Sequence, residues 1–268
     1  MANGEFHKMH GLGNDFVIID ARARPVEMPP ARARAIADRK LGIGCDQLIL
    51  LLPSDIADVT MRIFNPDGGE VEACGNASRC VVALLKQDLE IETKSGVISG
   101  RMSGDEIAVS MGEAKFEWQD IPLAFAIDTA SMPLGWEELE NPMAVNMGNP
   151  HAVFFVDDVD TVDLPRLGPI IEHDAVFPER VNVNVASIDG NEIRLNVWER
   201  GAGLTGACGT GACATAVAAI RQGKVQSPVV VHQSGGSLTI AWAPGQPVIM
   251  TGGATYVFTG EASWDDFG

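Results

Sequence analysis

The sequence is poor in several features that would point to whole classes of protein. It holds 19 Lys and Arg against 36 Asp and Glu, a formal net charge of −17, which argues against nucleic acid or anionic membrane as a partner. The longest aliphatic run, Leu48–Leu52, is far too short to span a bilayer. Residues Met1–His10 contain no apolar stretch of the kind that signal peptides need. These absences favour a cytoplasmic protein.

Cysteine is scarce as well, and the five residues present follow no metal or disulfide pattern. An odd number of cysteines without an export signal indicates reduced thiols. There is no CxxC motif and no paired-histidine spacing, so neither zinc nor another metal is expected. The segment Gly42-Ile43-Gly44 is too short a glycine motif to indicate a nucleotide.

What the sequence does contain is an internal repeat. Cys74-Gly75 and Cys208-Gly209 lie 134 residues apart in a chain of 268 residues. Each cysteine follows an alanine, Ala73 or Ala207, and each has an aromatic residue ten positions upstream. Gly13-Asn14 is echoed by Gly148-Asn149 at an offset of 135, at which Gln47 also falls opposite Asn182. Several matches in the same order predict two copies of one domain.

Short apolar runs bounded by Gly, Pro, Asn or Asp predict many strands and few helices. The expected strands are Phe16–Asp20, Gln47–Leu52, Thr60–Asn65, Ile107–Ser110, Ala152–Val156, Val183–Ser187, Ile193–Trp198, Val229–His232 and Leu238–Trp242. The expected helices are Pro30–Lys40, Asn76–Gln87 and Thr210–Gln222. The last two are rich in Ala and Val, which predicts helices surrounded by protein. We therefore expect an α+β fold in which each copy is a curved sheet wrapped around one helix, with Gln119–Pro133 linking the copies.

A cysteine at a helix start has a distinct chemistry. The first turn offers unpaired N–H groups and a partial positive charge, which favour the thiolate of a cysteine and can hold a carboxylate. The glycine after each cysteine lets a ligand approach the backbone. Two such thiols suit an enzyme that removes a proton from one side of a carbon and returns one to the other. Cys80 and Cys213 lie on other helical faces, and we interpret them and Cys45 as core packing.

These residues resemble the diaminopimelate epimerase family over residues 8 to about 260. The segments that carry the resemblance are Lys8–Phe16, Phe64–Gly68, Glu72–Asn76, Gly148–His151, Glu179–Asn182, Trp198–Gly201 and Ala207–Gly211. The resemblance implies interconversion of LL- and meso-diaminopimelate without pyridoxal phosphate, other cofactor or metal, on the route to lysine and peptidoglycan. It implies two homologous α+β domains related by a pseudo-twofold axis, at residues 1–120 and 121–254. It also implies that the last strand, within 255–268, packs on the first domain and that the chain forms a homodimer.

The resemblance further implies roles for individual residues. Cys74 and Cys208 would be the two acid/base thiols, and His151 and Glu199 would tune the pKa of the thiols. The residues that would bind the substrate are Asn14, Gln47, Asn65, Gly75, Asn76, Asn149, Asn182, Glu199, Arg200, Gly209 and Thr210. Phe258 stands where many members have a Tyr that supports the dimer.

Two other functions stay open at the level of sequence. A thiol redox protein could pair Cys74 with Cys208, although the chain has no CxxC motif. A related isomerase could act on proline, hydroxyproline or another amino acid. Arg200 favours diaminopimelate over such substrates, because a monoamino acid has no distal carboxylate for a bidentate arginine contact.

Overall fold

A computed structural model describes the chain except for residues 1, 2, 73 and 268, so Ala73 of the first cysteine motif lies outside the described residues. The chain divides into two compact units. The first consists of Met1–Val109 with Gly252–Gly268, and the second of Ser110–Thr251. The family resemblance implies divisions near residues 120 and 254.

The first unit is a mixed sheet with two helices. The strands follow in the order β19-β1-β2-β3-β4-β6-β7-β8, and the short β5 pairs with β4. The pairs β2/β3 and β4/β6 are parallel and the others antiparallel. The strands are β1 (Asn3–Gly11), β2 (Asn14–Asp20), β3 (Gln47–Leu52), β4 (Val59–Phe64), β5 (Glu70–Val71), β6 (Leu89–Thr93), β7 (Gly96–Ser103), β8 (Glu106–Ser110) and β19 (Thr255–Ser263). The helices are α1 (Pro30–Ala37) and α2 (Gly75–Leu85), followed at the end of the chain by the 3₁₀ turn η2 (Trp264–Phe267).

The second unit repeats this plan. Its strands follow in the order β11-β12-β13-β14-β16-β17-β18, and the short β15 pairs with β14. The parallel pairs are β12/β13 and β14/β16, which match β2/β3 and β4/β6. The strands are β9 (Gly135–Trp136), β10 (Leu139–Glu140), β11 (Met143–Asn146), β12 (Pro150–Phe155), β13 (Asn182–Asp189), β14 (Glu192–Glu199), β15 (Gly203–Thr205), β16 (Val229–Gln233), β17 (Gly236–Ala241) and β18 (Ile249–Gly252). The helical segments are η1 (Val159–Thr161), α3 (Leu164–Glu172) and α4 (Gly209–Arg221).

Strand register confirms the duplication. In the first unit Phe16 is paired with Gln47 across the parallel strands β2 and β3. In the second unit His151 is paired with Asn182 across β12 and β13. Both residues of the second pair lie 135 positions after their counterparts, which is the offset read from the sequence. The expected fold class, two repeated α+β domains built on mixed sheets, is therefore confirmed.

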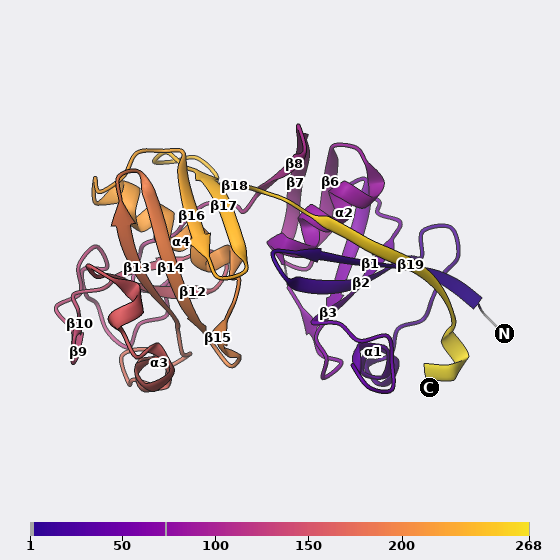
Figure 1. Cartoon of the computed structure of the whole chain (residues 1–268), viewed down its shortest axis with the longest axis horizontal. Helices are drawn as coiled ribbons and strands as arrows, with labels where there is room; N and C mark the ends of the chain where they lie inside the picture. Colours follow the sequence, from indigo (N-terminus) through magenta and orange to yellow (C-terminus); the bar gives the residue numbers. More distant parts are fainter. Residues whose placement is uncertain (1–2, 73, 268) are drawn as a thin grey trace. The chain divides into compact units, whose positions relative to one another are not determined.

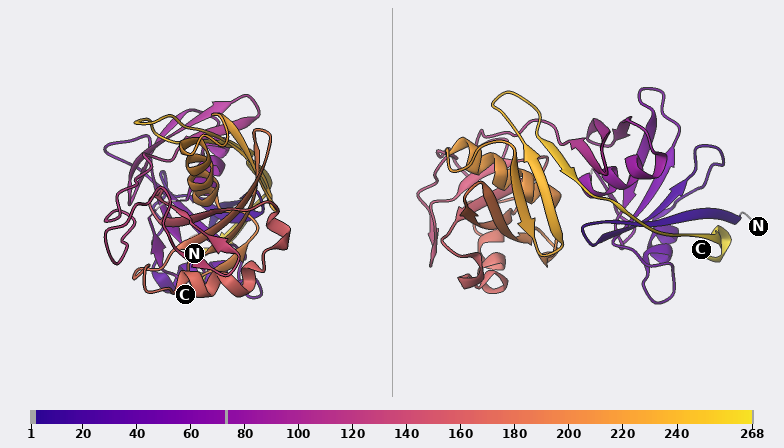
Figure 2. Two further views of the ribbon diagram at one scale, coloured as in Figure 1. Left: turned by 90° about the vertical axis from the view of Figure 1, so that its left-hand side faces the viewer. Right: turned by 45° about the horizontal axis from the view of Figure 1, so that its top comes forward.

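Each sheet curves around its central helix. Helix α4 contacts strands β11, β12, β13, β14, β16 and β17, and Figure 2 shows it with strands on either side. Helix α2 contacts β1, β2, β7 and β19. The helix positions from Gly75 to Val82 and from Gly211 to Ala219 are buried. This burial explains why both helices are rich in small and aliphatic residues, as the sequence analysis expected.

One expectation about the chain between the repeats is wrong. The segment Gln119–Pro133 was expected to link the copies, but it belongs to the second unit. Ile121, Leu123 and Met132 are at most 4% exposed and lie in the hydrophobic core of that unit. Their burial stabilises the segment as part of the folded unit, so it is not a free linker.

The last strand returns to the first unit. Strand β19 pairs with β1 in antiparallel fashion, from Asn3 opposite Ser263 to His10 opposite Thr255. Figure 1 shows the two strands side by side along their length. Gly260 is needed here, because a Cβ at this position would lie 2.5 Å from the ring of Phe6. The first unit is thus built from both ends of the chain.

Candidate active site

Cys208 is the N-cap residue of α4, at the point where an extended chain turns into the helix. Its backbone angles are φ −124° and ψ 109°, and its sulfur accepts a hydrogen bond from the backbone N–H of Gly211 at 3.4 Å. A sulfur in this position receives the partial positive charge of the helix start. The residues that follow, Gly209 and Thr210, form the first turn, whose N–H groups lack partners within the helix.

The surroundings of Cys208 oppose ionisation of its thiol. Only 4% of the residue is exposed, and burial raises the pKa of the Cys208 thiol well above its usual value. The negative charge of Glu199 is the next cause and raises the pKa further, while hydrogen bonds from Thr210 and Gly211 lower it by less. A helix start by itself favours the thiolate, and for Cys208 the expectation based on it is wrong. Burial and Glu199 outweigh the helix start.

Glu199 reaches this thiol from the end of β14. Its Oε1 accepts a hydrogen bond from Thr205 Oγ1 at 2.5 Å, and Thr205 lies on the paired strand β15. Glu199 also forms a side-chain hydrogen bond with Cys208 that raises the pKa of the thiol. A carboxylate accepts but does not donate, so the thiol must donate in this contact. The contacts of Glu199 therefore raise the pKa of the Cys208 thiol, which is the kind of effect expected of this residue.

A further contact at this helix start was not expected from the sequence. Gln233, the last residue of β16, accepts the backbone N–H of Cys208 through Oε1 at 2.7 Å. Its Nε2 is buried and has no hydrogen-bond partner among the described residues. The turn after Gln233 is joined to the loop before Cys208 by bonds from the Gly235 N–H and the Ser234 hydroxyl to the carbonyl of Gly206. Gln233 therefore meets Cys208 through a contact between segments far apart in the sequence.

Arg200 follows Glu199 in the loop after β14. Its backbone N–H donates to Asn182 Oδ1 at 2.9 Å, and its guanidinium donates through Nη1 to the carbonyl of Glu179 at 3.0 Å. Asn182 is 2% exposed and also donates through Nδ2 to Pro150 O at 2.8 Å. Both polar groups of the Asn182 side chain are thus used within the protein. The Arg200 side chain is exposed and keeps further donors for a ligand.

His151 is fully buried and is held between two asparagines. Its Nε2 lies 2.8 Å from Asn149 Oδ1, and its Nδ1 lies 3.0 Å from Asn184 Nδ2. Asn149 Oδ1 can only accept, so Nε2 carries the proton and Nδ1 accepts from Asn184. Burial lowers the pKa of His151 to about 3, which makes the imidazole neutral at neutral pH. The contacts of His151 are with Asn149 and Asn184, and they connect it with Asn149 of the expected substrate-binding set rather than with Cys208.

In the first unit Cys74 is the N-cap residue of α2. Its angles, φ −149° and ψ 109°, resemble those of Cys208, but its side chain makes no cap hydrogen bond. Cys74 Sγ lies 3.9 Å from Asn14 Oδ1, which also accepts from Asn76 Nδ2 at 3.3 Å. The residue is partly exposed, unlike Cys208. The structure thus brings together Asn14, Asn76 and the thiol, and Gly75 begins the helix beside them.

The side chain of Asn76 is oriented by a buried arginine. Arg79 is fully buried and donates through Nη2 to Asn76 Oδ1 at 2.9 Å and through Nε to the carbonyl of Gly253 at 3.3 Å. The Asn76 side chain therefore has a fixed orientation, with its carbonyl towards Arg79 and its amide N–H towards Asn14.

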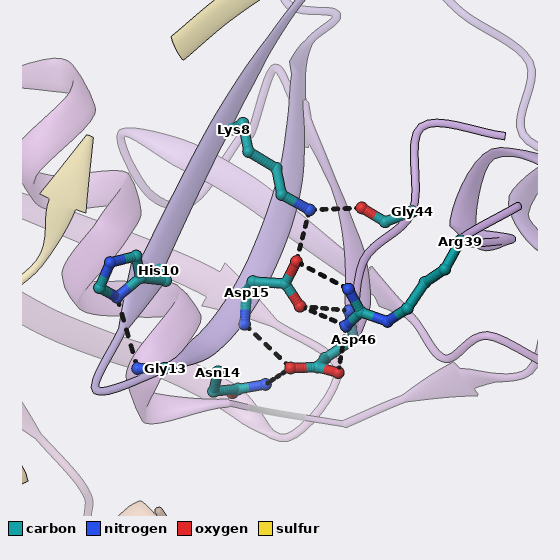
Figure 3. A network of polar contacts seen from close by, with 8 residues as sticks. All are labelled: Lys8, His10, Gly13, Asn14, Asp15, Arg39, Gly44 and Asp46. Atoms are coloured by element: carbon teal, nitrogen blue, oxygen red, sulfur yellow. Dashed lines mark hydrogen bonds and ion pairs between the residues drawn. The ribbon is translucent and has the colours of Figure 1, made fainter. Parts of the chain in front are cut away.

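Asn14 is oriented by a network of charged residues that the sequence analysis did not single out. Asn14 Nδ2 donates to Asp46 Oδ2 at 3.2 Å, and the same oxygen accepts the backbone N–H of Asp15 at 3.0 Å. Arg39 bonds both carboxylates, at 2.6 Å to Asp15 and 2.7 Å to Asp46, and Lys8 bonds Asp15 (Figure 3). Burial alone would raise the pKa of Asp15, but the hydrogen bonds from Arg39 and Lys8 outweigh it and hold that pKa below its usual range. The acceptor-only carboxylate of Asp46 fixes the amide of Asn14, so that Oδ1 faces Cys74.

The remaining expected residues of the first unit form a pair. Gln47 Nε2 donates to Asn65 Oδ1 at 3.0 Å, from the start of β3 to the end of β4. Gln47 Oε1 is buried and has no partner among the described residues. The pair thus presents an amide acceptor without a protein donor, which a ligand ammonium or hydroxyl could use.

The other cysteines pack in the cores. Cys45, Cys80 and Cys213 are at most 1% exposed, as expected. Burial raises the pKa of Cys45 to about 11 and that of Cys80 to about 12. All five cysteines lack a disulfide bond.

Among the described residues no group of His, Cys, Asp and Glu is arranged to hold a metal ion, and no helix is long and apolar enough to cross a bilayer.

Comparisons with known proteins point in one direction. A sequence model of the family described as diaminopimelate epimerase matches residues 6–117 and 143–257. A protein of Rhizorhabdus wittichii named diaminopimelate epimerase is 65% identical over 265 residues, covering 98% of this chain and 97% of the relative. One of the same name from Sphingopyxis alaskensis is 64% identical over 264 residues, covering 98% of both chains.

Solved structures of the same fold are more distant. A phenazine biosynthesis protein of the PhzF family from Bacillus anthracis superposes with a TM-score of 0.71 at 17% identity, covering 98% of this chain and 100% of the other. A hydroxyproline epimerase from Agrobacterium vitis, solved with bound trans-4-hydroxy-L-proline, gives a TM-score of 0.68 at 15% identity, covering 98% and 91%. At this identity the likeness establishes the fold alone.

Proposed function

This chain belongs to the diaminopimelate epimerase family, and on that premise we propose that it interconverts LL- and meso-diaminopimelate at one α-carbon. The observation that carries the proposal is a cysteine at the N-cap of the buried central helix in each of two repeats, Cys74 and Cys208. The identity of 64–65% with relatives of that name over nearly the whole chain supports the substrate. The reaction feeds the biosynthesis of lysine.

We propose a mechanism in which Cys74 and Cys208 are the two acid/base groups. One acts as thiolate and removes the α-proton, and the other acts as thiol and supplies a proton to the opposite side of the carbon. The charges then balance, because each turnover exchanges the protonation states of the two sulfurs. No other bond of the substrate forms or breaks. Protonated Cys208, held by burial and Glu199, fits the role of the proton donor in one direction.

The substrate groups have matching partners in each unit. The N–H groups of Gly75, Asn76, Gly209 and Thr210 lie in the first turns of the two helices and suit a carboxylate. The exposed guanidinium of Arg200 suits the distal carboxylate by a bidentate contact, and Glu199 and the buried Gln47 Oε1 suit an ammonium. Asn14, Asn65, Asn149 and Asn182 complete the set, the last by holding the backbone of Arg200.

The expected partner is a second copy of the chain. Tyr256, Val257 and Phe258 on β19 are 48%, 52% and 47% exposed, and pairing of two copies along this strand would cover apolar surface. Sedimentation equilibrium at micromolar concentration should therefore give a dimer mass, and a monomer would contradict this part of the proposal. We place the enzyme in the cytoplasm, where its thiols stay reduced.

The substrate is tested with purified protein and LL-diaminopimelate, followed by chiral chromatography under reducing conditions. We expect an equilibrium mixture of LL and meso isomers, and we expect L-lysine to react very poorly because it has no distal carboxylate for Arg200. Equal turnover of lysine, or turnover of proline instead of diaminopimelate, would favour a related isomerase. Activity that needs an oxidant would favour a redox protein.

Deuterium oxide tests the two-group mechanism. The proton that reaches the carbon comes from the second thiol, which has exchanged with solvent, so early product should carry deuterium at its α-carbon. Unreacted substrate should remain largely protonated. Early deuterium in substrate and product alike would contradict two separate groups and favour a single base that returns its proton to either side.

A further inference from the structure

Glu172 is a buried carboxylate that the proposed chemistry leaves without a role. It is the last residue of α3 and is 3% exposed. Its Oε2 accepts the indole N–H of Trp198 at 2.7 Å, and its Oε1 accepts the backbone N–H of Gly201 at 3.0 Å. Arg180 Nη1 lies 3.7 Å from the same Oε1. One side chain thus bonds the chain on both sides of Glu199 and Arg200.

These contacts and one from Asn182 fix the end of β14 and the loop after it at three places. Trp198 is held by its indole, Arg200 by the bond from its backbone N–H to Asn182, and Gly201 by its backbone N–H. Gly201 has a φ of +77°, a conformation that residues with a Cβ rarely adopt. The directions in which Glu199 and Arg200 leave the backbone are therefore set by Glu172 and Asn182.

The location of Glu172 is unfavourable for stability. The C-terminal end of a helix carries a partial negative charge, which repels a carboxylate, and burial removes the carboxylate from water. An apolar residue of similar size would pack at this position at a lower cost in free energy. The two N–H donors and the nearby Arg180 guanidinium compensate the carboxylate, and both N–H donors belong to the segment that carries Glu199 and Arg200.

The same face of α3 is shaped to receive Trp198. Gly168 lies one turn before Glu172, and a Cβ at residue 168 would be 2.4 Å from Cγ of the Trp198 ring. The indole therefore rests on the backbone of α3 at Gly168 while its N–H reaches Glu172. Two residues four positions apart on one helix face fix a single side chain.

Among the described residues of the first repeat there is no counterpart to this arrangement. Phe64 occupies the position of Trp198 and has no N–H to donate. The loop after it is held by bonds from Asn65 N–H to Gly69 O at 2.8 Å and from Gly68 N–H to Asn65 O at 2.9 Å. The second of these has an equivalent in the other repeat, from Ala202 N–H to Glu199 O at 3.0 Å, so the bonds to the carboxylate are additional there. The carboxylate clamp is found in the repeat whose loop carries two charged residues, Glu199 and Arg200.

We propose that Glu172 is a positioning residue, which through Trp198 and Gly201 sets the placement of Arg200 towards the substrate and of Glu199 towards Cys208. The inference rests on the proposed function, since it concerns residues of that site. Glu172 itself touches neither substrate nor thiol in this proposal.

Glu172→Gln tests the clamp with little change of shape. A Gln has one acceptor and one donor group where Glu has two acceptors, so its NH₂ must face either the indole N–H or the Gly201 N–H. We expect the KM for LL-diaminopimelate to rise about tenfold, because a displacement of an ångström can cost up to about 100-fold and the Gln retains one of the two bonds. Glu137→Gln is the control, since Glu137 pairs with Arg166 of the same helix in an exposed ion pair and should leave KM unchanged.

A second substitution tests whether Glu172 and Trp198 act together. Trp198→Phe alone should also raise the KM, because it removes the indole contact with Glu172. In the double variant Glu172→Gln/Trp198→Phe the Gln can accept from Gly201 while its NH₂ meets no donor, so we expect a KM no higher than that of the more affected single variant. A double variant with a KM as high as the product of the two single effects would overturn the proposal, because a purely structural defect would add rather than cancel.

Spectroscopy separates this inference from the proposed function. In ¹⁵N-labelled protein the indole N–H resonance that disappears in Trp198→Phe belongs to Trp198. It should shift upfield in Glu172→Gln but not in Glu137→Gln. An unshifted indole resonance, or a shifted one with an unchanged KM, overturns the positioning role. Lack of diaminopimelate turnover by the unmodified protein would instead overturn the proposed function and leave the indole result to decide whether the clamp exists.

Discussion

In the first repeat Cys74 begins its helix partly exposed and faces the neutral amide oxygen of Asn14, whereas in the second Cys208 begins its helix buried and faces the carboxylate of Glu199. The two helices start with nearly the same backbone angles and lie in sheets of the same strand order. Duplication therefore preserved the position of the thiol but not its partner. The lesson is that topology places a reactive group, while a few neighbouring side chains decide its protonation.

The most severe test of the comparison removes each thiol in turn. Cys74→Ala and Cys208→Ala should each reduce epimerisation by about 10²–10⁴-fold, the range for loss of an acid or base group. Cys80→Ala and Cys213→Ser, which alter buried cysteines one or two turns further along the same helices, should retain activity. A chiral assay on the four variants would contradict the equal importance of the two repeats if one N-cap variant kept a near-normal rate.

A second test uses the different residues at one register position, His151 in the second repeat and Phe16 in the first. The pKa of His151 is about 3 in the folded chain and 6.5 in its usual environment, so between these values the unfolded state binds the proton and the folded state does not. Its contribution to stability is complete above pH 6.5 and is lost as the pH falls towards 3. Between pH 6.5 and 5 this amounts to roughly 2 kcal/mol of unfolding free energy.

Urea unfolding at pH 7 and pH 5 measures that difference. His151→Gln should remove most of it, and hydrogen exchange at pH 5 should show lost protection in Ser110–Thr251 before Met1–Val109. An equal loss of protection in both units at pH 5 would assign the acid sensitivity elsewhere.

A smaller effect should follow from changing the group that orients Asn14. Asp46 accepts from Asn14, Asp15 and Arg39, and Asp46→Asn must turn a donor towards one of them. We expect kcat/KM to fall about tenfold, a loss of roughly 1.4 kcal/mol, without loss of the folded state. Glu70→Gln is the matched control, because it removes an exposed ion pair with Arg62 in the same unit. Unchanged kcat/KM in Asp46→Asn would show that Cys74 does not depend on a fixed Asn14.

The smallest expected effect compares the far ends of the two helices. The C-cap residue after α2 is Lys86, which has a φ of +54°, whereas the C-cap residue after α4 is Gln222 with a φ of −81°. Lys86→Gly should stabilise the protein by about 1 kcal/mol, since glycine adopts the left-handed conformation without steric cost. Gln222→Gly should not stabilise it. Thermal unfolding of both variants checks the pair, and a stabilised Gln222→Gly would contradict the explanation.

Sequence patterns predicted the parts of the fold that are regular and apolar. The nine expected strands and three expected helices are present, with ends shifted by at most three residues. The apolar patterns alone do not predict β19, because residues 255–259 are exposed and show no alternation. The family resemblance does predict it, and the pairing of β19 with β1 confirms that the last strand packs on the first unit. The sequence patterns did not predict helix α3, because Pro165, Gly168 and Pro169 lower its helix propensity. The helix forms because tertiary packing on Trp198 outweighs that low propensity.

Site residues could be predicted where they lie in a local sequence motif. They could not be predicted where they depend on contacts between segments that are far apart in the sequence. Helix-start cysteines and the loop residues Glu199 and Arg200 could be found from their order in the repeat. The depth of Cys208 could not, so the direction of its pKa was predicted wrongly. Glu172 and Asp46 could not be found either, because each meets its partners through elements far apart in sequence.

The pairing of β1 with β19 fixes the order in which the chain can complete itself during synthesis. When residues 3–109 have left the ribosome, β1 has β2 on one edge and nothing on the other, because its second neighbour at residues 255–263 has not been made. The second unit is continuous from Ser110 to Thr251 and has all of its strands before β19 emerges. The pairing of β19 with β1 is thus the last step in folding of the first unit, and it joins two strands near opposite ends of the chain. Until then β1 is an open strand edge, the kind of surface on which nascent chains aggregate and which chaperones protect.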